Sequence, residues 1–184
     1  MLELVALGTD VEGAVAVAAE LGGTCYVNHS GESERRPFST LLRIDTDEIE
    51  RVRAVADVAL HVCHRRVIRP EPEPRPSDRV VAVFGLVHHP DLDHRRADDH
   101  WRDVHAPLAL VNHAAMCDYT QLSVVATLDG PPLDGLALCA FADRDELRTR
   151  FFNDEAAKAV IEADVATFAD PARSPRRVVM VTVV

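Results

Sequence analysis

A proline-rich segment near the middle of the chain constrains the fold more than any other feature. Residues 69–76 read RPEPEPRP, so every second residue is a proline. Proline has no backbone N–H and favours the extended polyproline conformation, so such a segment neither continues a helix nor donates hydrogen bonds along a sheet. We therefore predict a linker over residues 70–79, between residues 1–69 and residues 80–184.

The two parts of the chain show the same order of predicted elements. Alternating or short apolar runs indicate strands, and apolar positions three and four residues apart indicate helices. Residues 1–69 contain predicted helices over 11–21 and 46–58, a polar loop after residue 29, and strands over 2–7, 24–29, 38–44 and 60–68. Residues 80–184 contain predicted helices over 95–112 and 144–168 and strands over 80–87, 118–125, 133–141 and 177–184. Each part therefore has the order βαββαβ of a ferredoxin-like unit.

A unit of this kind leaves one face of its sheet uncovered, and that face must be buried. Two such units in one chain can cover each other. We therefore expect an α+β fold of tandem ferredoxin-like βαββαβ repeats that pack sheet to sheet as an α+β barrel, which is an intramolecular pseudo-dimer. Pairing of both repeats with a second chain, in a homodimer, is the alternative that the sequence leaves open.

The charge of the chain disfavours several classes of partner. Thirty Asp and Glu residues against twenty Lys and Arg residues give a formal net charge of −10, which disfavours nucleic acids and anionic membrane surfaces. No apolar run approaches the roughly 20 residues of a membrane span. The N-terminus reads MLELVAL and lacks the basic start of a signal peptide. We expect a cytoplasmic protein without a nucleic-acid or membrane partner.

Several kinds of cofactor site have no signature in this sequence. The four cysteines, at positions 25, 63, 117 and 139, lack the paired spacing of a zinc site or a disulfide framework. We expect them to behave as small buried apolar residues. No predicted strand is followed by a glycine-rich phosphate loop, a dinucleotide-binding fingerprint or a nucleophile elbow. We therefore predict neither a metal nor a cofactor.

Histidines are concentrated in the second part of the chain. Six of the nine lie between His88 and His113, whereas the helix predicted over residues 11–21 carries none. We therefore expect the functional site in residues 80–184 and a structural role for residues 1–69. His100 and His105 are five residues apart, so in an α-helix they diverge and do not chelate one metal ion.

His105 is the first candidate for acid–base chemistry. It shares a helix face with Trp101, and neighbouring apolar positions turn that face inward. A histidine on a buried apolar face needs a polar partner, and an imidazole that titrates near neutral pH is a suitable general acid or base. The alternative is a core histidine that anchors the helix, with Trp101 as part of the same core.

Three further residues are predicted to face the same cavity. Tyr119 and Gln121 alternate on one face of their strand and are suited to orient a carbonyl or enol oxygen. Asp98 lies seven residues before His105 on the same helix face and is a candidate to fix the tautomer of His105. Its structural alternative is a surface carboxylate in the first turn.

Two other side chains are candidates with equally plain structural alternatives. His88 lies where a strand leaves the sheet, which suits a second acid–base group or an ordinary loop histidine. Asp164 lies on the apolar side of the last helix, which suits a buried functional carboxylate or a cap for a neighbouring loop.

Four motifs in residues 80–184 resemble the EthD family of the dimeric α+β barrel superfamily. They are HWRDVHAPL over residues 100–108, Asp134-Gly135 at a strand entry, Glu146-Leu147 at a helix start, and Asp164, Phe168 and Asp170 near the end of the last helix. The resemblance implies the barrel fold. The superfamily includes cofactor-free monooxygenases, lactone isomerases, polyketide cyclases and dehydratases, and haem proteins.

Residues and resemblance together favour a cofactor-independent enzyme that acts on a hydrophobic, carbonyl- or phenol-bearing metabolite by proton transfer. Isomerisation, cyclisation, dehydration and decarboxylation all fit this lyase- or isomerase-type chemistry. His105, His88 and Tyr119 are the expected catalytic residues, and the expected substrate-binding residues are Trp101, Gln121, Asp98 and Asp164. The alternatives are a non-catalytic protein that binds a small molecule, and a haem- or oxygen-using monooxygenase.

Overall fold

The computed structural model describes residues 1–29 and 36–184, which form an α+β fold around a closed antiparallel barrel of eight strands. The mixed α+β class predicted from the sequence is confirmed. The strands of residues 1–69 are β1 (Leu2–Gly8), β2 (Thr24–Asn28), β3 (Thr40–Ile44) and β4 (Ala59–Arg69). Those of residues 80–184 are β5 (Val80–Leu86), β6 (Asp118–Asp129), β7 (Gly135–Phe141) and β8 (Val178–Thr182).

The strand order is the same in both parts of the chain. Around the barrel it reads β1-β3-β2-β8-β5-β7-β6-β4, so each part pairs its fourth, first, third and second strands in that order. Two antiparallel pairs join the parts: β2 with β8, and β4 with β6. The β4–β6 pair extends from Leu60 beside Asp129 to Arg69 beside Tyr119. Both parts of the chain therefore contribute to one barrel.

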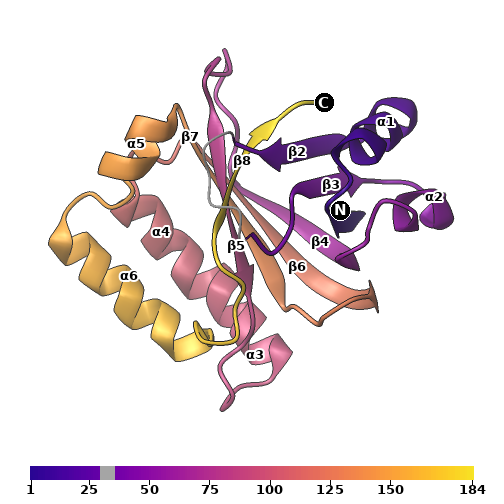
Figure 1. The fold of residues 1–184 in the computed structure, drawn as a ribbon. Coiled ribbons are helices and arrows are strands. Elements are labelled where there is room, and N and C mark those ends of the chain that lie inside the picture. The colour runs from indigo at the N-terminus through magenta and orange to yellow at the C-terminus, as the bar shows by residue number, and fades with distance from the viewer. Residues whose placement is uncertain (30–35) are drawn as a thin grey trace.

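The helices lie outside the barrel on opposite sides (Figure 1). On one side are α1 (Val11–Leu21) and α2 (Ile49–Arg53). On the other, α3 (His94–His100), the π-helical turn η1 (Trp101–His105) and α4 (Ala106–Asn112) follow one another, and α5 (Arg144–Thr149) and α6 (Glu155–Phe168) complete the layer. Figure 1 shows α4 and α6 side by side. Among the described residues, no helix has the length and apolar character needed to cross a membrane.

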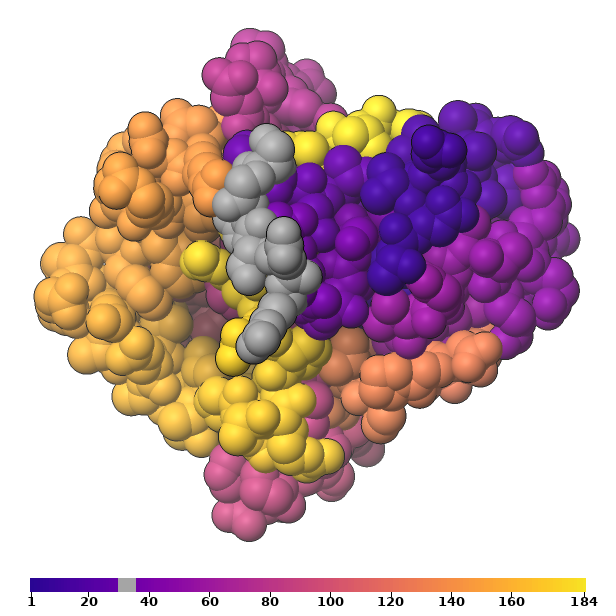
Figure 2. Space-filling view, viewed as in Figure 1, coloured from indigo at the N-terminus to yellow at the C-terminus, as the bar shows by residue number. Residues whose placement is uncertain are grey.

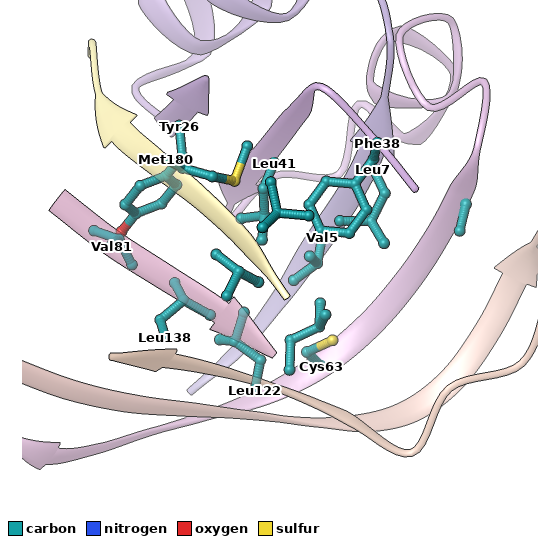
Figure 3. Close-up of a cluster of buried hydrophobic side chains, with 14 of the residues drawn as sticks. Val5, Leu7, Tyr26, Phe38, Leu41, Cys63, Val81, Leu122, Leu138 and Met180 are labelled. Carbon is teal, nitrogen blue, oxygen red and sulfur yellow. The ribbon is translucent and has the colours of Figure 1, made fainter. Parts of the chain in front are cut away.

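Apolar side chains from both parts of the chain fill the barrel interior (Figure 3). Val5 and Leu41 come from the first part, and Leu122, Leu138 and Met180 from the second. Because successive side chains on a strand point to opposite faces, the alternate residues of β5, β6, β7 and β8 point away from the interior, toward the outer helices. A ligand cavity must therefore lie between the sheet and these helices, since the interior is occupied.

The local signals at the ends of α1 agree with the structure. The Asp10 side chain accepts a hydrogen bond from the Gly13 N–H at 3.0 Å. Gly22 ends the helix with φ at 74°, a conformation that glycine adopts without strain. The polar loop predicted after residue 29 lies mostly outside the described residues.

Two predicted helices differ from the structure. The helix predicted over 46–58 spans only Ile49–Arg53, because the following turn brings the Val58 N–H to the Leu7 carbonyl at 3.0 Å and starts the next strand. The helix predicted over 144–168 is interrupted between α5 and α6. At this break Asn153 donates to the Val111 carbonyl at 2.7 Å, and Asp154 accepts from the Ala157 N–H at 2.8 Å as a new N-cap.

Candidate active site

A cavity of about 440 Å³ lies between the outer face of β5, β6 and β7 and the helices that cover these strands. Its walls are mainly apolar and aromatic, and two imidazoles, those of His105 and His113, also line it. The aromatic residues of the wall include Trp101, Tyr119, Phe151, Phe152 and Phe168. A concave, mostly apolar site with a few polar groups is the usual form of a small-molecule site.

The π-helical turn η1 places His100 and His105 on one side of the helix. In an α-helix, side chains five residues apart differ in direction by about 140°. In η1 the Ala106 N–H donates to the Trp101 carbonyl five residues earlier, which widens the turn and brings positions five apart together. Pro107 follows without an N–H to donate. The prediction that His100 and His105 diverge is therefore wrong, because it assumed α-helical periodicity.

Asp164 lies between these two histidines. Its Oδ2 is 2.8 Å from His105 Nδ1, and its Oδ1 is 2.7 Å from His100 Nε2. Only 9% of its side chain is exposed. Asp164 occupies the buried face of α6 together with Phe168, whose ring lies 5.0 Å from the His100 ring and 5.2 Å from the His105 ring. The last helix thus supplies both the carboxylate and the apolar surface that hold His105.

His105 has the properties of a neutral base. Burial lowers its pKa below the usual value of 6.5, and the nearby Asp164 carboxylate offsets part of that effect. With the Nδ1–H donated to Asp164, the lone pair of a neutral imidazole is on Nε2. Nε2 has no hydrogen-bond partner in residues 1–29 and 36–184. His105 is therefore positioned to accept a proton from a molecule in the cavity.

The Tyr119 hydroxyl lies at the centre of a buried hydrogen-bond network. It accepts from Trp101 Nε1 at 3.2 Å and from Gln121 Nε2 at 3.0 Å. Gln121 Nε2 also donates to the Trp101 carbonyl at 3.0 Å. Burial raises the pKa of Tyr119 well above its ordinary value. Tyr119 therefore stays protonated at neutral pH, and neither of these two hydrogen bonds uses its hydroxyl hydrogen.

Arg66, on β4 in the first part of the chain, supports this network from behind. Its guanidinium donates to Gln121 Oε1 at 3.0 Å, forms an ion pair with Asp98, and lies 5.7 Å from the centre of the Trp101 ring. The guanidinium fixes the Gln121 amide so that its nitrogen faces Tyr119. Asp98 contacts Arg66, and the carboxylate beside His105 is that of Asp164. The prediction that Asp98 fixes the tautomer of His105 is therefore wrong.

Two glycines make room for the cavity walls. A Cβ at Gly135 would lie 2.4 Å from Cζ3 of Trp101, and a Cβ at Gly85 would lie 2.4 Å from Cγ of Pro175. Gly85 is on β5 and Gly135 is on β7, the strand beside it. The absence of side chains at these positions lets the indole and the proline pack directly on the sheet.

His88 lies outside the cavity lining. Its Nδ1 is 2.8 Å from Asp134 Oδ2, and His94 Nδ1 is 2.7 Å from Asp134 Oδ1. The hydrogen bonds of this histidine–carboxylate–histidine cluster hold the exit of β5 and the start of α3 against the loop before β7. The structure thus brings together His105, Trp101, Tyr119, Gln121 and Asp164 and leaves His88 apart. No three His, Cys, Asp or Glu side chains in the described residues are arranged to hold a metal ion.

Three residues of the cavity wall, His113, Phe151 and Phe152, were not predicted from the sequence. Their rings contact one another, with the His113 ring 4.6 Å from Phe151 and 5.0 Å from Phe152. His113 Nδ1 also contacts the Phe151 carbonyl. Asp154 is the residue that could have indicated them. An Asp before an apolar helical run favours an N-cap, so a helix break is expected just before it, where Phe151 and Phe152 lie.

Comparison with solved structures identifies related folds at low identity. The chain is similar to an anthrone oxidase-like protein with a TM-score of 0.56 and 14% identity, over 100% of this chain and 90% of that one. It is also similar to a protein of Fusobacterium nucleatum subsp. nucleatum named as a putative monooxygenase. That match has a TM-score of 0.56 and 8% identity, over 98% of this chain and 91% of the other. At such identities the likeness is one of fold. A search of curated proteins finds no significant match.

The EthD domain family matches residues 89–172, which include both His105 and Asp164. The matched range covers α3 through α6, the strands β6 and β7 between them, and the helical side of the cavity. The resemblance expected from the sequence motifs is confirmed. Residues 89–172 of this chain therefore match the EthD domain.

Proposed function

We propose that this protein is a cofactor-independent enzyme that transfers protons on a hydrophobic, carbonyl- or phenol-bearing metabolite. The observation that carries the proposal is His105, whose Nδ1 is held 2.8 Å from Asp164 in the wall of a mainly apolar cavity. A histidine oriented by a carboxylate, with its other nitrogen toward a substrate, is the arrangement used by general bases.

In this mechanism, His105 Nε2 accepts a proton from the carbon next to a carbonyl or from a phenol. Asp164 stabilises the imidazolium that forms, and negative charge develops on the substrate oxygen. The Tyr119 hydroxyl already accepts two hydrogen bonds, from Trp101 and Gln121, so its own hydrogen is available to that oxygen. Return of the proton from His105 to another carbon completes an isomerisation. In a dehydration, His105 returns the proton to a hydroxyl group of the substrate, which leaves as water as the carbon–carbon double bond forms.

A second candidate function is oxidation by O₂, favoured by the names of the two similar structures, an anthrone oxidase-like protein and a putative monooxygenase. The first step is shared, because removal of a proton by His105 produces a carbanion or phenolate. O₂ then accepts electrons from that anion in the oxidative reaction, whereas the anion is reprotonated or eliminates water in the first proposal. Oxygen uptake measured with an electrode during turnover separates the two, and a Soret band would indicate haem instead.

Substitution of His105 tests the proposal. General acid–base groups contribute roughly 10²–10⁴-fold to rate, so His105→Asn should lower kcat by that order while the protein stays folded. His64→Asn is the matched control, because His64 is an exposed histidine on β4. Turnover by His105→Asn at the wild-type rate would reject the proposal. If the wild-type protein binds a ligand but does not turn it over, and His105→Asn binds that ligand with the same affinity, a non-catalytic binding protein would be favoured.

We also infer that the barrel is an intramolecular pseudo-dimer of two ferredoxin-like units. The same strand order in each part and the two joining pairs, β2 with β8 and β4 with β6, support this inference. Because each sheet covers the inner face of the other, a second chain is not needed to bury that face. Sedimentation equilibrium should therefore show a folded 20.2 kDa monomer at high dilution.

A further inference from the structure

A second hollow lies against the wall of the cavity. It has a volume of about 820 Å³ and is open to solvent between α5, α6 and the start of β8. In Figure 2 the surface is hollowed between the orange and yellow segments that form α5 and α6 and the yellow C-terminal segment. Four cationic side chains line this basic hollow: Arg144, Arg148, Lys158 and Arg177.

The basic hollow contrasts with the rest of the molecule. The chain has a formal net charge of −10, whereas the lining of the hollow contains four cationic side chains and the carboxylates Asp154 and Glu155. Arg148 is paired with Asp145 at 3.3 Å, so the candidate ligand contacts are Lys158 and Arg177. Asp154 accepts the Ala157 N–H as a helix cap. Glu155 is 94% exposed and lies 3.9 Å from Lys158. Within the described residues, neither of these carboxylates forms an ion pair with Arg177.

Two of the cations are available to a ligand. Arg177 is exposed and forms no ion pair within residues 1–29 and 36–184. The ion pair of Lys158 with Glu155 is long and exposed, so solvent and salt screen it. An anionic group that enters the hollow can contact both cations without breaking a buried interaction.

Phe151 and Phe152 line both the cavity and the basic hollow. Their rings meet edge to face with centroids 4.7 Å apart. The segment that carries them is held in place by Asn153, which donates to the Val111 carbonyl and accepts from the Ala114 N–H, each at 2.7 Å. Phe151 and Phe152 therefore form the boundary between the two, and a molecule that passes these rings would place an apolar part in the cavity and a polar end in the hollow.

We propose that the basic hollow is the subsite for a carboxylate carried by the same metabolite. The substrate class is then an amphipathic acid, with an apolar ring system beside His105 and a carboxylate beside Arg177 and Lys158. This inference rests on the proposed function, because it assumes that the cavity binds the reacting part of the substrate. The apolar walls of the cavity would bind the ring system of the substrate. Arg177 and Lys158 would bind its carboxylate and so fix the orientation in which the substrate enters.

The experiment uses ω-cyclohexylalkanoates of increasing chain length and their primary amides as probes. Trp101 is the single tryptophan of the chain and lines the cavity, so its fluorescence reports occupancy. These probes do not absorb where tryptophan is excited. Once the chain is long enough to pass Phe152, the acid should bind roughly tenfold more tightly than its amide, since two exposed ion pairs each contribute a few-fold.

The variant that tests the subsite is Arg177→Gln with Lys158→Gln. It should bring the acid and its amide to nearly equal affinity and leave the affinity of the amide unchanged. The matched control is Arg95→Gln with Arg96→Gln, which changes charge equally at two exposed arginines of α3 outside the hollow. The control should retain the full preference for the acid.

Each outcome has a defined meaning. Equal affinity of acid and amide in the wild type at every chain length would overturn the subsite and leave the proposed function standing. A preference for the acid that survives in Arg177→Gln/Lys158→Gln would also overturn it. If neither acids nor amides change Trp101 fluorescence, the cavity does not take an apolar body, and the subsite falls together with the proposed function.

Discussion

At the scale of single residues, the site depends on one imidazole and the groups that set its protonation. Burial lowers the pKa of His105, and Asp164 works in the opposite direction. The same carboxylate bonds to His100, so it orients both rings through one side chain. In the proposed mechanism, the residue that prepares His105 to act as a base is Asp164, which lies 59 positions later in the sequence.

Asp164→Asn should separate positioning of His105 from general stability. Loss of the carboxylate removes stabilisation of the imidazolium, so kcat should fall by about 10²-fold or more. The pKa of His105 should fall further, which moves the acidic limb of the kcat/KM profile to lower pH. The pH–rate profile and NMR titration of the His105 ring measure these effects.

The control for this variant is Asp134→Asn. Asp134 also bonds to two histidines, His88 and His94, but lies outside the cavity lining. Its replacement should leave the pH–rate profile in place. An Asp164→Asn enzyme with an unshifted acidic limb would show that Asp164 does not act through His105.

At the scale of elements, the π-helical turn η1 and the strands β5 and β7 shape one side of the cavity. The turn η1 rotates His100 toward the same carboxylate as His105, and β7 offers Gly135 as the surface on which Trp101 packs. The order of helices and strands was predictable because apolar periodicity is local. The π-turn was not, because it differs from an α-helix by a single hydrogen-bond shift that α-helical spacing rules do not include.

Gly135→Ala tests the packing of Trp101 on β7. The new Cβ would lie 2.4 Å from Cζ3 of Trp101, and overpacking of this kind costs about 1–3 kcal/mol. Urea unfolding should show that loss, and Trp101 fluorescence should change in the native state. Gly22→Ala is the control, because a Cβ there meets no atom within 4 Å and only the positive φ is strained. It should lower stability without altering the fluorescence, and an unchanged spectrum in Gly135→Ala would contradict the packing argument.

At the scale of the whole molecule, three buried histidines make stability depend on pH. Burial lowers the pKa of His61, of His105 and of His113. In the unfolded chain their pKa values return to about 6.5, so below that pH the unfolded state binds protons that the folded state does not. Their contribution is complete above about pH 6.5 and is lost as the pH falls through the folded-state pKa values.

Urea unfolding at pH 7.5 and pH 5.5 measures this dependence. The free energy of unfolding should fall between these values, by at most about 1.4 kcal/mol per pH unit for each histidine. Asp118 has the opposite effect on the free energy of unfolding. Burial raises its pKa, so the folded state takes up a proton at a higher pH than the unfolded state does, which favours folding as the pH falls. His61→Gln should flatten the profile, and His64→Gln, at an exposed position, should not. A profile that is flat in the wild type would contradict the assignment.

The sequence by itself determined the order of elements and the resemblance of residues 89–172 to the EthD domain, and it led to the prediction that His105 is central to the site. These depend on short motifs and on periodicities that extend over a few residues. Only the tertiary structure decided that Asp164 and not Asp98 holds His105, and that Arg66 supports Gln121 across the β4–β6 pair. Such partners meet because closure of the barrel brings distant strands side by side and packs α6 against η1, and no local pattern encodes those distances.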